Sequence, residues 1–211
     1  MDEFPDSELL IKRHVVFAQS TKGFDELKQD SDQEPHTKVW QFSSEKGYRI
    51  NVTTKSIHIS SNMHKSYNMG DNKFRDIIEL AVTKFLKVLP IKKIKRIGLR
   101  YVDHAPIFKK ENKDFKQCYN TAFPLSRFKI EDAIEMSFGT VVKRGNYFLR
   151  YFEVLPKDKD DLLILDFDGY AQDIKIGKWL ETLDNIHMMI RKEFENSIKE
   201  PIYKFMEKEG E

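Results

Sequence analysis

The feature that most constrains this sequence is a change of hydrophobic period on either side of Pro90. From Asp71 to Leu89 apolar side chains recur every three or four residues, which predicts an amphipathic helix with Asp71 as its N-cap. From Arg96 to Tyr101 they alternate with polar residues, which predicts a strand with one apolar and one cationic face. Such a chain is expected to pack helix against sheet.

The cationic face of this strand carries Arg96, Gly98 and Arg100, whereas Ile97, Leu99 and Tyr101 point the other way. Gly98 lies between the two arginines. Because glycine has no side chain, another backbone, side chain or ligand can come close at this position.

Two β-rich regions flank this stretch. Alternating patterns predict strands at residues 9–17, 39–42, 48–53, 57–59, 134–142, 147–155 and 162–170, and Trp40 is expected to anchor a core. Residues 176–198 repeat the helical spacing and predict a second long helix, followed after Pro201 by a short helix at residues 202–206. Residues 23–37 and the lysine-rich segment 106–116 predict loops.

The economical architecture is therefore α+β, with antiparallel, curved β-sheet in two β-rich halves, each packed on one long amphipathic helix. We expect a single domain over residues 1–211, with halves at roughly 1–105 and 120–211 joined by the lysine-rich loop.

Composition narrows the classes of function. The 36 Lys and Arg nearly balance the 34 Asp and Glu, and a net charge of +2 argues against a polybasic protein that coats nucleic acid. Cys118 is the single cysteine, which excludes an internal disulfide framework and a Cys-rich zinc site. The acidic N-terminus has no leader pattern, and no apolar run approaches about 20 residues. We expect a cytoplasmic protein without a membrane partner.

The run Arg-Ile-Gly-Leu-Arg-Tyr at residues 96–101, after an amphipathic helix that ends at Pro90, resembles the hallmark of an uncharacterised, sporadically distributed family of prokaryotic proteins. The strand at residues 165–168 and a helix with Leu183, His187 and Phe194 are similar to that family's C-terminal part. The chain departs from the family in Val102-Asp103, where Asn is common soon after the Tyr. The patchy distribution implies a mobile or defence-associated system.

Asp166 and Asp168 stand two apart on a predicted strand, so their carboxylates share a face. Two carboxylates can bind a divalent metal and support a metal-dependent hydrolase. Alternatively, they can pair with Arg96, Arg100 or Arg150, because guanidinium groups bind carboxylates bidentately. The sequence favours the second interpretation: a ligand or structural ion-pair cluster with no metal.

Positive charge is concentrated around Pro90. The cationic residues there are Lys84, Lys87, Lys92, Lys93, Lys95 and Arg96. With a neighbouring aromatic ring such a surface could hold a nucleic-acid backbone, and the alternative is a solvated lysine surface.

No catalytic residue is assigned, because no serine or cysteine stands in a nucleophile motif and no histidine spacing matches a zinc site. Asp103 and His104 are adjacent on a strand and point to opposite faces. The leading hypothesis is a non-enzymatic protein-interaction module or accessory subunit, without a cofactor, that binds another protein. A nucleic-acid-binding component and a metal-dependent hydrolase are the alternatives.

Overall fold

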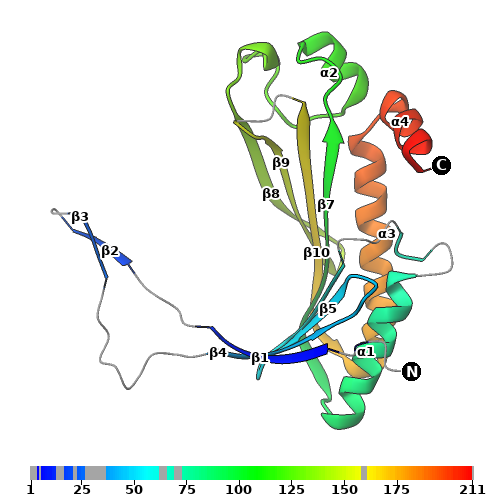
Figure 1. Ribbon diagram of the computed structural model, residues 1–211. Helices are drawn as coiled ribbons and strands as arrows, with labels where there is room; N and C mark the ends of the chain where they lie inside the picture. The colour runs from blue at the N-terminus through cyan, green and yellow to red at the C-terminus, as the bar shows by residue number, and fades with distance from the viewer. Residues whose placement is uncertain are drawn as a thin grey trace. The chain divides into compact units, whose positions relative to one another are not determined.

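The computed structural model describes Phe4 and residues 6–12, 17–20, 23–26, 37–61, 66–68, 73–157 and 161–210. The chain divides into two compact units, Met1–Pro90 and Ile91–Glu211 (Figure 1). The helix before Pro90 and the arginine-bearing strand after it therefore belong to different units. Both units combine helix with antiparallel sheet, so the chain is α+β as the sequence predicts.

The first unit contains a four-stranded antiparallel sheet in the order β1-β4-β5-β6. These strands are Asp6–Lys12, Thr37–Ser43, Tyr48–Val52 and Ile57–Ser61. α1 (Phe74–Val88) contacts β6, and the ring of Phe74 stacks on that of Tyr48 with centroids 6.4 Å apart. The predicted helix thus covers part of the sheet that precedes it. Its predicted N-cap, Asp71, lies outside the described residues.

Two predictions in this unit are wrong in detail. Residues 23–37 include a strand, β3 (Gly23–Glu26), which pairs with β2 (Phe17–Ser20) as a separate two-stranded sheet. The Gly-Phe-Asp-Glu sequence of β3 has no run of alternating apolar residues, so the pattern gives no sign of a strand. Trp40, expected to anchor a core, is 51% exposed on β4.

The second unit contains the sheet β7-β10-β9-β8. Its strands are Lys93–Pro106, Leu162–Lys175, Tyr147–Leu155 and Met136–Arg144, all antiparallel. The hairpin predicted over residues 134–155 is confirmed as β8 and β9, with Gly145 in the turn at φ +61°. β7 is the predicted arginine-bearing strand, and it pairs with β10 along nearly its whole length.

α3 (Trp179–Ser197) lies on one face of this second sheet, against β10 and β7. Leu163, Leu165 and Phe167 of β10 are fully buried toward it, together with Ile186 of the helix. Gly169 permits the close approach, because a Cβ at this residue would lie 2.7 Å from Cγ2 of Ile186. We call the α3 side of this sheet the inner face and the opposite side the outer face.

Two shorter helices complete the second unit. α2 (Asn112–Cys118) contacts α4 (Glu200–Gly210), and Tyr119 forms a β-bridge with Ile198. α2 overlaps the segment 106–116 predicted as a lysine-rich loop, so that prediction is wrong there: a seven-residue helix shows too few apolar repeats to be recognised. Within the described residues, no helix is long and apolar enough to cross a membrane.

Candidate functional site

The outer face of the second sheet carries the predicted arginine and aspartate residues. Side chains alternate along each strand, so the residues between the buried ones of β7, β9 and β10 all reach this face. Its members include Arg96, Arg100, Val102, Val141, Lys143, Phe148, Arg150, Phe152, Asp166, Asp168 and Tyr170.

Arg100 of β7 and Asp166 of β10 form a bidentate pair on this face. Nε of Arg100 donates to Oδ1 of Asp166 at 2.8 Å, and Nη2 donates to Oδ2 at 2.6 Å. The hydrogen bonds to Asp166 raise the pKa of Arg100. The arginine side chain is 62% exposed and covers a carboxylate that is 15% exposed, so a solvated cation shields a nearly enclosed anion.

Arg96 reaches Asp168 by lying along the sheet over Gly98. Its Nη2 is 3.0 Å from both carboxylate oxygens of Asp168, and its guanidinium lies 4.5 Å from the ring centroid of Tyr170. A Cβ at Gly98 would lie 3.4 Å from Nη1 of Arg96. The side chain of Arg96 therefore takes the space that the missing side chain of Gly98 leaves.

Apolar and aromatic side chains border the two ion pairs. The rings of Phe148 and Tyr170 stack with centroids 5.1 Å apart and an interplanar angle of 13°. Phe152 lies over Gly139 of β8, where a Cβ would come within 2.5 Å of the ring. Phe152 is nevertheless 38% exposed, and Val102 is 50% exposed. The outer face is thus an exposed surface that mixes aromatic, aliphatic and paired charged groups.

Arg150 differs from the other two predicted arginines. It stands opposite Asp168 in the pairing of β9 with β10, and it is exposed. Within the described part of the chain its guanidinium forms no ion pair, because Asp168 is bound by Arg96. Arg150 is therefore a cation of this face that no carboxylate of the described residues neutralises.

The predicted lysine patch does not lie on one element. Lys84 and Lys87 belong to α1 in the first unit, whereas Lys92, Lys93 and Lys95 belong to the second. Nζ of Lys93 is 2.9 Å from a carboxylate oxygen of Asp173. Within either unit, the cluster is smaller than the sequence suggests.

Sequence reasoning missed Glu153, which points to the inner face of β9 and is 1% exposed. Its carboxylate accepts hydrogen bonds from the Thr121 hydroxyl, from the Ala122 backbone N–H at 2.8 Å and from the Tyr151 hydroxyl at 3.3 Å. Burial raises the pKa of Glu153, and these hydrogen bonds oppose that shift. The sequence does contain one sign of this site: Glu153 is a charged residue at an inward-facing position of an otherwise apolar strand.

Two further polar groups lie on the inner face of β7. The hydroxyl of Tyr101 is 3.1 Å from Nδ1 of His187 on α3, and burial lowers the pKa of that histidine. Burial also raises the pKa of Asp103 to about 6. Asp103 is half-buried and His104 exposed, in keeping with their positions on opposite faces.

In the described ranges, no three His, Cys, Asp or Glu side chains lie together in a way that could hold a metal ion. At Asp166 and Asp168 a metal would have to displace both guanidinium groups. Comparisons with protein-family models, curated proteins and solved structures gave no match. Among the described residues, the outer face presents paired and unpaired charges, stacked aromatic rings and apolar side chains.

Proposed function

We propose that this chain is a non-enzymatic protein-interaction module that binds another protein through the outer face of its second sheet. The observation that carries the proposal is the exposure of Val102 and Phe152 beside three arginines on one sheet face. Protein interfaces are enriched in arginine and aromatic residues, which also dominate binding energy. The stacked pair of Phe148 and Tyr170 supplies further rigid aromatic area.

The ion pairs favour binding for a second reason. Asp166 and Asp168 hold Arg100 and Arg96 above the sheet through ion pairs whose guanidinium groups are exposed, and exposed pairs are weak, so both arginines could turn toward carboxylates of a partner with little loss of stability. Arg150, without an ion pair among the described residues, would meet an acidic group of that partner. The face would thus offer three guanidinium groups to acidic groups of the partner.

Two finer features of the proposal, the curvature of the sheets and the cellular setting, rest on the amino-acid sequence alone. Each sheet would curve around one long helix, α1 or α3, and present its other face to a partner. The cellular setting we propose is the prokaryotic cytoplasm, where the chain would act as an accessory subunit of a defence-associated system. That setting is what the resemblance of the Arg-Ile-Gly-Leu-Arg-Tyr run implies.

The test is a pull-down of the tagged chain from its native host with two matched variants. Val102→Lys places a long cation in the middle of the outer face, beside Asp166, whereas Val88→Lys makes the same change at an exposed valine of α1. We expect a partner protein that survives nuclease treatment, is retained by Val88→Lys and is lost from Val102→Lys. Equal recovery by both variants would contradict the proposal.

The same experiment separates the nucleic-acid alternative. If the chain recovers nucleic acid, and that recovery disappears in high salt, the cations contact phosphates. Charge reversal of Lys92, Lys93 and Lys95 should then abolish the recovery, whereas Val102→Lys should leave it intact or increase it. This result would make nucleic-acid binding, and not protein binding, the function that the data support.

A further inference from the structure

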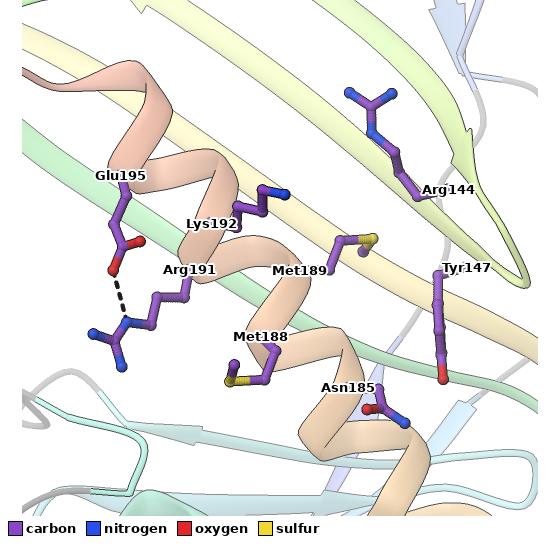
Figure 2. A pocket seen from close by; sticks show the side chains of 8 residues that line it. All are labelled: Arg144, Tyr147, Asn185, Met188, Met189, Arg191, Lys192 and Glu195. Atoms are coloured by element: carbon purple, nitrogen blue, oxygen red, sulfur yellow. Dashed lines mark hydrogen bonds and ion pairs between the residues drawn. The ribbon is translucent and has the colours of Figure 1, made fainter.

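A groove on the inner side of the second unit lies outside the face considered above. It runs between α3 and the end of the β8–β9 hairpin and has a volume of about 940 Å³ (Figure 2). Such a volume accommodates several side chains of a peptide. Every residue that lines it belongs to the second unit, so its geometry depends on one compact body.

The rim of the groove is cationic. Arg144 projects from the end of β8, and Lys192 and Arg191 project from α3. Arg191 is engaged, because its Nε donates to Oε1 of Glu195 at 2.8 Å. Glu195 is the only acidic residue in the lining, so this pair leaves no carboxylate in the groove for the other two cations.

Arg144 and Lys192 therefore retain capacity for an anionic ligand. The contact of Arg144 with Glu193 is 3.7 Å long, beyond hydrogen-bond distance. Among the residues that the structure describes, Lys192 forms no ion pair. In Figure 2 the side chain of Lys192 extends from the helix toward the side on which Arg144 lies.

The floor and walls of the groove are apolar. Met189 reaches the sheet, since its Cε lies 3.0 Å from the position that a Cβ on Gly169 would take. Met188 is 59% exposed on α3, and Tyr147 lines the groove from the start of β9. Methionine side chains are flexible and polarisable, and they adapt to different apolar partners.

We propose that this groove binds an acidic peptide segment of another protein. Carboxylates of the peptide pair with Arg144 and Lys192, and an adjacent apolar side chain packs on Met188 and Met189. Charge complementarity favours this occupant, because the lining has three cations against one carboxylate that is already paired. The open groove suits a peptide lying along α3 better than a small molecule that needs enclosure on all sides.

The test begins with the full chain and a displayed library of random dodecapeptides. We expect enrichment of peptides that combine Asp or Glu with a neighbouring large apolar residue. An enriched peptide, labelled with fluorescein, should bind at least about tenfold more weakly to Arg144→Glu and to Lys192→Glu than to the wild type. Met188→Ala should also weaken binding, by several-fold.

Matched controls separate the groove from its surroundings. Lys143→Glu reverses a charge next to Arg144 on the opposite face of β8, and Met206→Ala truncates an exposed methionine on α4. Both should bind the peptide like the wild type. Failure to enrich acidic peptides, or equal weakening by Arg144→Glu and Lys143→Glu, would overturn the proposal.

This inference is independent of the function proposed for the outer face. Val102→Lys should leave peptide binding in the groove unchanged, and Lys192→Glu should leave the outer-face partner bound. Loss of one interaction with retention of the other therefore identifies which of the two proposals has failed.

Discussion

The two faces of the second sheet stabilise carboxylates in opposite ways. On the inner face Glu153 is almost completely enclosed and is held by hydroxyl and backbone N–H donors. On the outer face Asp166 and Asp168 are held by arginines that themselves remain exposed to solvent. The inner carboxylate is therefore part of the fold, whereas the outer carboxylates position cations on a surface.

The glycines of the two faces differ in the same way. A Cβ at Gly169, on the inner face, would meet Ile186, Ile190 and Met189 of a packed helix. The three atoms nearest to a Cβ at Gly139, on the outer face, all belong to the ring of Phe152, and this side chain is 38% exposed. The inner face should consequently be intolerant of substitution and the outer face tolerant, and four experiments test this difference.

The largest expected effect is that of Glu153→Leu. The substitution removes the acceptor of the Thr121 hydroxyl and of the Ala122 N–H in a buried site, and it should lower the free energy of unfolding by about 3 kcal/mol. Urea denaturation measures the change. Asp166→Asn is the outer-face counterpart and should lower it by less than about 1 kcal/mol, because Arg100 remains solvated. Equal losses of unfolding free energy in Glu153→Leu and Asp166→Asn would show that the two faces do not differ in this way.

Gly169→Ala comes next in size. The added methyl group would overlap Cγ2 of Ile186, which is fully buried, so we expect a loss of about 2 kcal/mol from overpacking. Gly139→Ala should change stability by less than about 1 kcal/mol, because the Phe152 ring can swing outward and alanine restricts the unfolded strand. Thermal unfolding of both variants gives the comparison. A more destabilising Gly139→Ala would contradict it.

Much of this contrast can be predicted from the sequence, because strand periodicity assigns each residue to a face. The alternation of Ile97, Leu99 and Tyr101 with Arg96 and Arg100 is enough to indicate the two faces of β7. The same rule places Asp166 and Asp168 together on β10. Ion pairs with these arginines are the hypothesis that the sequence favours, and two such pairs are present.

Other features depend on contacts between distant segments, which periodicity does not contain. The buried role of Glu153 requires the loop at Thr121 to lie beside β9, 32 residues further along the chain. The groove requires the end of β8 to lie near α3. The division at Pro90 is a third case, because α1 and β7 are adjacent in sequence but belong to different units. Local patterns do not determine which neighbours pack together.

The third experiment uses pH to probe the inner face at Asp103. Its pKa is raised from 3.8 to about 6 by burial, so the folded protein holds this proton more tightly than the unfolded chain. The contribution of protonated Asp103 to the free energy of unfolding is fully present below about pH 4, and it is lost as the pH rises from about 4 to about 6. After allowance for solvent screening, we expect a loss of about 1 kcal/mol across this window.

Asp103→Asn isolates this effect, because asparagine does not titrate. Urea unfolding at about pH 4 and about pH 6.5 should show the wild type losing stability relative to the variant as pH rises. Other titrating groups contribute equally to both proteins and cancel in the difference. A difference that is constant with pH would show that burial does not raise the pKa of Asp103 in the folded protein.

The smallest effect concerns the pairing of Arg100 with Asp166, measured by a double-mutant cycle with Arg100→Ala and Asp166→Asn. The geometry is bidentate, yet the guanidinium is mostly in water, so we expect a coupling energy below about 1 kcal/mol that decreases further in about 1 M salt. A weak coupling means that Arg100 can shift toward a partner's carboxylate with little loss of stability, as the protein-binding proposal requires. A coupling of several kcal/mol, unaffected by salt, would instead make the pair part of the scaffold, like Glu153 on the inner face. The outer face would then be rigid for structural reasons, and its arginines would no longer support a role in binding.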